Sequence, residues 1–178
     1  LHVLYCEKHT KQVEQKSDKN LYEEAVELYE NGLYKETVDR LTEISSDKQD
    51  SPENFTLLAR AYANQGKLSE AQKWCEKAIN IDKLNPVYHY LLATILQEQG
   101  EIKEAIDSLR RALYLDGDFV IAHFAMGNLV RMKGRRRESK KHFDNALKLL
   151  KYYKKDKILP ESEGLTAGRL SEIINSMM

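Results

Sequence analysis

Residues 54–82 read NFTLLARAYANQGKLSEAQKWCEKAINID, and this stretch decides the fold. From Phe55 to Tyr62 the apolar side chains follow the spacing i, i+3, i+4, i+7, which is typical of the buried face of a helix. Gly66 is expected to end that helix, since glycine takes the left-handed conformation that often follows a helix end. Helical spacing resumes over 68–81, so the stretch predicts two helices joined by a tight turn.

The same pattern recurs with a period of 34 residues. Glycines mark it at positions 32, 66, 100 and 134, small residues at 25, 59, 93 and 127, and large apolar residues at 41, 75, 109 and 143. A unit repeated at a fixed interval indicates a repeat architecture, in which neighbours bury what one unit leaves exposed. The sequence therefore predicts an all-α chain. Its parts are an N-terminal linker or domain remnant at 1–17, four two-helix units at 18–51, 52–85, 86–119 and 120–153, and a linker with a C-terminal helix at 154–178.

The ends of the predicted helices carry recognisable signals. Pro52 and Pro86 fall in the first turn of a helix, where the missing N–H costs no hydrogen bond. Ser69 and Thr166 are expected to cap helix starts with their hydroxyl oxygens. The first unit departs from the others, because Ile44 stands where later units have alanine and the second helix of that unit is expected to be short.

The 34-residue unit resembles the tetratricopeptide repeat, a helix–turn–helix with Gly, Tyr, Ala and Phe at these offsets. The stretch 54–82 is a clear example, and AHFAMGNLVRMKGRRRESKKHFDNALKL at 122–149 is another. The resemblance implies a right-handed α-solenoid whose first helices line a concave groove that binds a protein or peptide segment. The partner stays open, because this repeat is a binding scaffold with many partners.

On this resemblance, nine groove-facing side chains are the candidate partner-binding site, and they are expected to lie outside the core. Arginine and asparagine can hold a peptide backbone or a carboxylate, while tyrosine and phenylalanine supply buried contact area. The candidates are Thr56, Arg60 and Asn64 from the second unit, Tyr90, Thr94 and Gln97 from the third, and Phe124, Asn128 and Arg131 from the fourth.

A second resemblance extends over about 55–176 and is most distinctive in LPESEGLTAGRLSEIINSM, at 159–177. These stretches look like the repeat region attached to CheR-type chemotaxis receptor methyltransferases. That resemblance implies a parent protein that methylates receptor glutamates with S-adenosylmethionine in a separate catalytic domain, and a chemoreceptor or another signalling protein as the partner. No glycine-rich loop follows a strand in this sequence, so the chain itself is expected to bind no cofactor and to be non-catalytic.

The composition excludes several classes of protein. Of the 178 residues, 31% are charged, and no apolar run approaches the roughly 20 residues that a transmembrane helix needs. The first residues lack the layout of a signal peptide, and two cysteines cannot form a disulfide framework, so a cytoplasmic location is expected. Because the sequence begins with Leu1, we expect it to be a piece of a longer protein.

No pattern of a catalytic or metal-binding site stands out. His2, Cys6 and His9 fit one helix face and could bind zinc, but no fourth ligand can be named, and stray polar residues are the simpler interpretation. His89 and His123 occupy equivalent positions in two units, where packing between helices is favoured over a pH-sensing pair. Cys75 is one of the residues at the large apolar positions 41, 75, 109 and 143 of the repeat, and it is predicted to lie in the core.

The net charge of zero hides a strong asymmetry. Residues 131–157 carry 12 basic and 3 acidic residues, whereas the rest of the chain carries 16 basic and 25 acidic residues. A solvated final helix is the simplest interpretation of the basic segment. Two alternatives stay open: a nucleic-acid-binding adaptor that stacks bases on Tyr152 and Tyr153, which is not favoured, and a generic scaffold with no link to chemotaxis.

The end of the sequence predicts a docking helix. Leu170, Ile173, Ile174 and Met177 follow the spacing i, i+3, i+4, i+7. A helix of about 11 residues is marginal alone in water, so this one must dock on the rest of the chain. Covering the apolar face of the last repeat is the simplest interpretation, and docking in the groove stays open.

Overall fold

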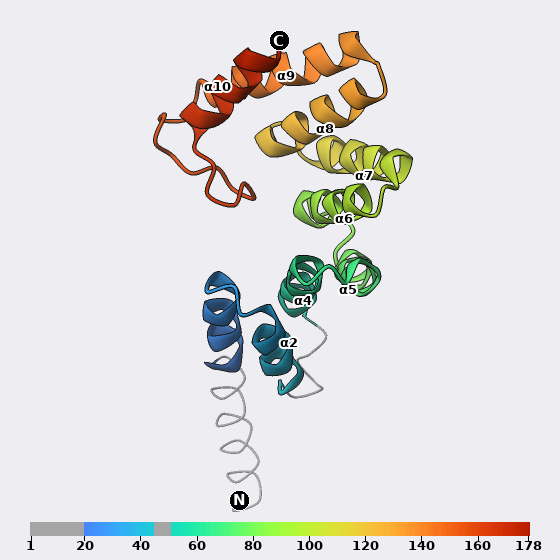
Figure 1. Cartoon of the computed structure of the whole chain (residues 1–178), viewed down its shortest axis with the longest axis vertical. Coiled ribbons are helices and arrows are strands. Elements are labelled where there is room, and N and C mark those ends of the chain that lie inside the picture. The colour runs from blue at the N-terminus through green and yellow to red at the C-terminus, as the bar shows by residue number, and fades with distance from the viewer. Residues whose placement is uncertain (1–19, 45–50) are drawn as a thin grey trace, which may run out of the picture. The chain divides into compact units, whose positions relative to one another are not determined.

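The computed structural model describes residues 20–44 and 51–178, and these residues are helical apart from short turns and one longer connection at 151–166 (Figure 1). Their only β feature is an isolated antiparallel bridge between Ile158 and Thr166, so the predicted all-α class is confirmed for the described chain. Residues 20–30 are helical, and the helices that follow are α2 (Tyr34–Thr42), α4 (Pro52–Asn64), α5 (Leu68–Ile81), α6 (Pro86–Glu98), α7 (Ile102–Leu115), α8 (Val120–Met132), α9 (Arg136–Leu150) and α10 (Ala167–Met177). The segment 1–17 and the zinc candidates within it lie outside the described residues.

The same glycine turn joins the two helices of every repeat. The turn glycines have φ angles between +74° and +83°, which is the left-handed region that side chains with a Cβ rarely adopt. In the second repeat, the Gly66 N–H donates to the Ala63 carbonyl at 2.9 Å, and the Lys67 N–H donates to the Tyr62 carbonyl at 3.0 Å. Equivalent bonds close the turns at Gly32, Gly100 and Gly134. The 34-residue spacing of the glycines therefore reflects one backbone conformation used four times.

Side-chain caps occur at the starts of α4 and α6, which are the first helices of the second and third repeats. The Ser51 hydroxyl accepts from the Asn54 N–H, and the Asn85 side chain accepts from the Val87 N–H. Thr166 caps α10 as predicted. The prediction that Ser69 caps α5 is wrong, because the glycine turn leads directly into a helix that begins one residue earlier.

The first compact unit contains the described residues up to Lys83. Its second helix, α2, has nine residues, whereas α5 has 14, so the first repeat contains the short helix that the sequence predicts. Ile44 is buried, at 4% exposure, beyond the end of α2. The core of this unit is made by Ala25, Val38, Leu41, Ile44, Leu57, Leu58 and Ala61.

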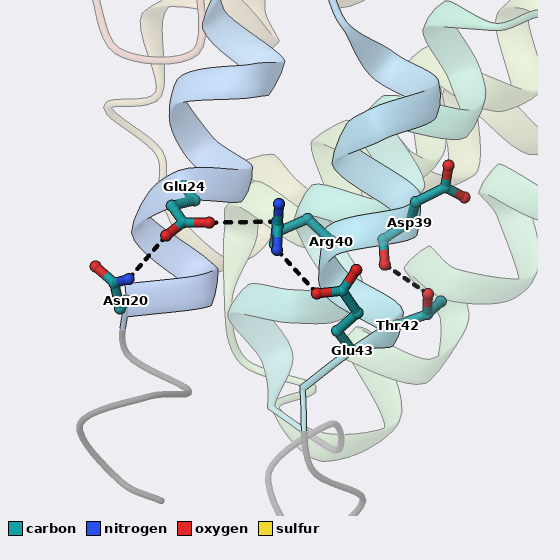
Figure 2. A network of polar contacts seen from close by, with 6 residues as sticks. All are labelled: Asn20, Glu24, Asp39, Arg40, Thr42 and Glu43. Atoms are coloured by element: carbon teal, nitrogen blue, oxygen red, sulfur yellow. Dashed lines mark hydrogen bonds and ion pairs between the residues drawn. The ribbon is translucent and has the colours of Figure 1, made fainter. Parts of the chain in front are cut away.

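Arg40 ties the helical residues 20–30 to α2 (Figure 2). Its guanidinium lies 3.3 Å from the Glu24 carboxylate and 2.8 Å from the Glu43 carboxylate. The Asn20 amide donates to Glu24 at 2.7 Å on the other side. Because the three ion-paired side chains are 35–55% exposed, this network contributes only about 0–1 kcal/mol to stability.

The second compact unit comprises residues 84–178 and has one continuous core that runs from α6 to α10. The small-residue column lets the two helices of a repeat approach closely. At Gly127 the approach leaves no room for a side chain, since an added Cβ would lie 2.6 Å from Cδ1 of the Phe143 ring. Phe143 is the largest of the residues at 41, 75, 109 and 143, and Gly127 is the smallest of those at 25, 59, 93 and 127. The Phe143 ring therefore fills the space that the missing side chain of Gly127 leaves open.

The C-terminal helix docks on the last repeat, which is the interpretation that the sequence favours. Leu170 and Ile174 are fully buried in the core of the second unit, and α10 lies alongside α9 (Figure 1). The connection before α10 is held by backbone bonds: the Ala167 N–H donates to the Lys157 carbonyl and the Gly168 N–H to the Lys155 carbonyl, both at 2.9 Å. The end of the chain is therefore an integral part of the second unit.

Candidate peptide-binding site

In the first unit, the predicted site residues lie on α4 at intervals of one helical turn. The Thr56 hydroxyl donates to the Pro52 carbonyl at 2.6 Å. The Asn64 amide donates to the Tyr29 hydroxyl at 2.9 Å and to the Arg60 carbonyl at 3.2 Å. The amide of Asn64 therefore links α4 to the helical residues 20–30, which is a structural role that the sequence did not reveal.

In the second unit, the predicted residues lie on α6 and α8 at the spacing i, i+4, i+7, so each set of three shares one helix face. On α6, Gln97 is exposed and the Thr94 hydroxyl donates to the Leu91 carbonyl at 2.7 Å. The other predicted residues of this unit are Tyr90 on α6 and Phe124, Asn128 and Arg131 on α8.

The two aromatic candidates are partly core residues. The Tyr90 ring lies 5.2 Å from the Phe119 ring, and the Phe124 ring lies 6.2 Å from the Phe143 ring. Both candidates are half-buried and pack against the core of the second unit. The expectation that these side chains lie outside the core therefore holds only in part, because a ring on the first helix of a repeat is long enough to reach neighbouring core aromatics.

Asn128 has an unsatisfied side-chain oxygen. Its Oδ1 atom is buried and accepts no hydrogen bond from any residue that the structure describes. Leaving a buried acceptor unpaired costs about 1–3 kcal/mol. A peptide backbone N–H is the kind of donor that would satisfy this atom.

Arg131 contacts the C-terminal helix. Its Nη1 donates to the Met177 carbonyl at 2.9 Å, so the guanidinium is held between the end of α8 and the end of α10. An open pocket of about 440 Å³ lies beside it, lined by Arg131, Arg136, Ser139, Lys140, Phe143 and Met177 among others. Arg136 and Lys140 were not predicted as site residues, although the basic start of α9 and the apolar spacing of the tail are both visible in the sequence.

His123 pairs with His142 of α9, a residue that the sequence analysis did not single out. The two Nδ1 atoms lie 3.0 Å apart, and Nε2 of His123 lies 2.9 Å from the Gly117 carbonyl. That carbonyl can only accept, so His123 carries its proton on Nε2 and accepts at Nδ1 from His142. Burial lowers the pKa of both imidazoles below the usual 6.5, and their mutual repulsion lowers the pKa of His142 further.

The remaining candidates for chemistry do not form a site. Burial raises the pKa of the Cys75 thiol to about 12, so this residue is a core residue and a poor nucleophile. Within 20–44 and 51–178, no three histidine, cysteine or acidic side chains are placed to hold a metal ion. Nor does any helix of these two ranges combine the length and the apolarity that crossing a bilayer requires.

Known proteins share the repeat and its fold. The family described as anaphase-promoting complex, cyclosome, subunit 3 (ANAPC3) matches residues 18–112. No curated protein matches the sequence. Among solved structures, a crystal structure of MamA is similar with a TM-score of 0.71 at 20% identity, covering 82% of this chain and 85% of that one. MamA from Desulfovibrio magneticus RS-1 has a TM-score of 0.69 at 16% identity, with 76% of each chain covered.

These likenesses identify the fold as an all-α solenoid of tetratricopeptide type. At 16–20% identity, the MamA structures show the fold alone. None of these likenesses is to a CheR-type methyltransferase.

Proposed function

This chain belongs to the ANAPC3 family of tetratricopeptide-type repeats, and on that premise we propose that it binds an extended segment of a partner protein along α8 and the neighbouring face of α6. Repeats of this type are protein-interaction scaffolds, which supports the prediction that the chain is non-catalytic. The partner segment would lie on the side chains at Tyr90, Thr94, Phe124 and Asn128.

The observation that carries the proposal is the unsatisfied oxygen of Asn128. Asn128 and Phe124 lie four residues apart on α8, so a polar atom and half of an aromatic ring share one helix face. An extended peptide offers an apolar side chain for the ring and, once the Asn128 amide rotates out of its buried position, a backbone N–H for the oxygen. A buried polar atom that is unpaired in the free protein is a plausible cost of keeping such a binding site.

The test separates binding from folding at this one residue. Peptides selected from a random phage-displayed library against the full chain would be labelled, and their affinity measured by fluorescence anisotropy. Asn128→Leu should weaken binding at least tenfold, because leucine cannot accept a hydrogen bond. The same substitution should raise the melting temperature, since it removes an unpaired buried acceptor of similar size.

Lys103→Ala is the matched control, because Lys103 is exposed on α7 and should leave both quantities unchanged. If Asn128→Leu binds the selected peptides as well as the parent chain does, the proposed site is wrong. A fall in melting temperature would show that the oxygen already has a structural partner, and would also count against the proposal.

Tyr90→Ala with Phe124→Ala is also expected to weaken binding at least tenfold, since an aromatic anchor at an interface centre is worth roughly 2 kcal/mol or more. Because both rings pack against core residues, this double variant should also lose stability. Its affinity must therefore be measured well below its own melting temperature.

A second candidate is the interaction arm of a CheR-type chemotaxis methyltransferase. It is favoured by the segment 159–177, which carries that resemblance and packs as an integral part of the second unit. The chain should then bind the signalling domain of a chemoreceptor, while calorimetry with S-adenosylmethionine should show no binding. Failure to bind chemoreceptor signalling domains would remove this candidate and leave the general scaffold function standing.

A further inference from the structure

The pocket beside Arg131 combines positive charge with an apolar floor. It lies where the end of α8, the first turns of α9 and the end of α10 meet, and all of its lining belongs to the second unit. Phe143, 2% exposed, and Met177 supply the apolar surface. Methionine is flexible and polarisable, so a floor of this kind adapts to apolar side chains of different shapes.

Three cations border this floor. Arg131 is oriented by its bond to the Met177 carbonyl, and that bond uses only one of the five donors of its guanidinium. Arg136 is exposed and forms no ion pair with a residue that the structure describes. Lys140 pairs with Asp144 at 2.9 Å, but this pair is largely exposed and therefore weak enough to exchange.

We propose that this pocket binds an acidic peptide segment of a partner protein, in which carboxylates flank an apolar side chain. The carboxylates would pair with Arg131, Arg136 and Lys140, and the apolar side chain would pack on Met177, above the buried ring of Phe143. Arginine suits this task, because its planar fork matches a carboxylate with two hydrogen bonds. The proposal goes beyond the proposed function, since Arg136, Lys140 and Met177 lie outside the candidate face on α6 and α8.

Charge complementarity selects the acidic partner. The three cations of the pocket belong to the segment 131–157, which carries 12 basic and 3 acidic residues. An apolar floor of phenylalanine and methionine favours a peptide over a nucleic acid, because bases bind by stacking on exposed aromatic faces. Tyr152, the most exposed aromatic side chain of this segment, does not line the pocket.

The experiment uses the full chain and a fluorescein-labelled acidic peptide in which glutamates flank a single leucine. Binding is measured by anisotropy at low salt, with a glutamine peptide and a peptide that has serine in place of leucine as comparisons. Arg136→Glu with Lys140→Glu should weaken binding of the acidic peptide at least tenfold. The glutamine and serine peptides should each bind more weakly than the glutamate–leucine peptide.

The matched control is Lys148→Glu with Lys151→Glu. It makes the same change of net charge in the same basic segment, at exposed residues outside the pocket lining. This control should lose far less affinity than the pocket variant. Asn128→Leu should leave the acidic peptide bound, so failure at this pocket and failure of the proposed site on α8 can be told apart.

Methionine spectra locate the bound peptide. The chain has four methionines, so methyl-labelled methionine gives a simple spectrum. Addition of the peptide should shift the signal of Met177, whereas Met126, which is 1% exposed and lies in the core, should not move. A Met177 signal that stays in place at saturating peptide would overturn the assignment of the pocket.

Three further results would overturn the proposal. Equal losses in the pocket variant and the control would show only general attraction to a basic segment. Displacement of the peptide by single-stranded RNA of similar affinity would assign the surface to nucleic acid. The helical residues 20–30 contain four glutamates and no basic residue, so self-association that depends on Arg136 and Lys140, without binding of the acidic peptide, would assign the pocket to a second copy of the chain.

Discussion

The helix pairs α6–α7 and α8–α9 follow the same 34-residue register but pack their interfaces differently. The first pair has Ala93 and Leu109 at two buried positions, and the second has Gly127 and Phe143 at the equivalent ones. A larger ring on one helix is matched by a smaller residue on the other. The two pairs therefore fill the space between their helices with different residues, and what they share is the combined size of the two residues.

The two pairs also differ in polar chemistry. The second pair contains the hydrogen-bonded imidazoles of His123 and His142, whereas the first has His89 and Ser108 at these positions. The start of α6 is capped by Asn85, but α8 starts after the buried Phe119 and has no side-chain cap. The same backbone conformation therefore accommodates different polar side chains, and different helix caps, at equivalent positions of the two pairs.

The largest effect is expected from a charge placed inside the first pair. Ala105→Glu should unfold much of the second unit, because Ala105 is 0% exposed and an unpaired buried carboxylate costs several kcal/mol. Thermal melting followed by circular dichroism checks this. Ala105→Ser is the matched control, since α9 has Ser139 at the equivalent position. If Ala105→Glu had nearly the helicity and the melting temperature of the parent chain, the assignment of Ala105 to a buried position of the 34-residue repeat would be wrong.

The volume exchange between the pairs can be broken and then restored. Gly127→Ala should destabilise the chain by about 1–3 kcal/mol, because the new methyl group overlaps the Phe143 ring. Adding Phe143→Leu recreates the combination found at Ala93 and Leu109, so the double variant should recover part of the loss. Chemical denaturation of the parent, the two single variants and the double variant measures the coupling between the two sites. If the free-energy changes of the single variants simply added up in the double variant, the volume exchange would be refuted.

Removing the cap that only the first pair possesses should have a moderate effect. Asn85→Ala should cost about 1 kcal/mol, since the Val87 N–H loses its acceptor. Asn85→Asp should keep most of the stability, because aspartate is an equally good cap. Denaturation midpoints of the two variants check the difference, and equal midpoints would mean that the cap contributes nothing.

The smallest effect should come from pH, through the two imidazoles of the second pair. Because the folded-state pKa values of His123 and His142 are lowered below 6.5, the unfolded chain binds more protons as the pH falls. The stabilisation is complete above pH 6.5 and is lost as the pH falls towards the folded-state pKa values. The melting temperature should therefore decrease from pH 7.5 to pH 5.5.

His142→Ser, which copies Ser108 of the first pair, should flatten this dependence. The comparison requires melting curves at several pH values for the parent and the variant. An unchanged slope in His142→Ser would mean that the imidazole pair does not titrate as proposed.

Local signals made the repeat predictable. Glycine is the residue that best tolerates the left-handed turn, and its period of 34 residues therefore marked every hairpin. Helical spacing of apolar residues marked the buried faces, including that of α10, because a helix brings residues three and four apart onto one side. Ser69 shows where such signals mislead, since a good capping residue has no role when the turn itself starts the helix.

The functional surface depended on contacts between distant residues, which no local pattern contains. Whether Tyr90 and Phe124 were free to bind or partly buried was decided by Phe119 and Phe143, on neighbouring segments. The pairing of His123 with His142, and not with its equivalent His89, depended on which side chain of the adjacent helix came within hydrogen-bonding distance.

Turn conformation and amphipathic spacing are properties of a few consecutive residues, and the amino-acid sequence alone was therefore enough to predict the helices and their period. It predicted that the tail helix must dock, but not which surface it covers. The pocket beside Arg131 is different, because it requires the ends of α8 and α10 and the start of α9 to meet. Its cations and apolar floor are up to 46 residues apart in the sequence. Only packing of the complete second unit brings their charge and apolar surface together, because side-chain chemistry combines over distances of a few ångströms.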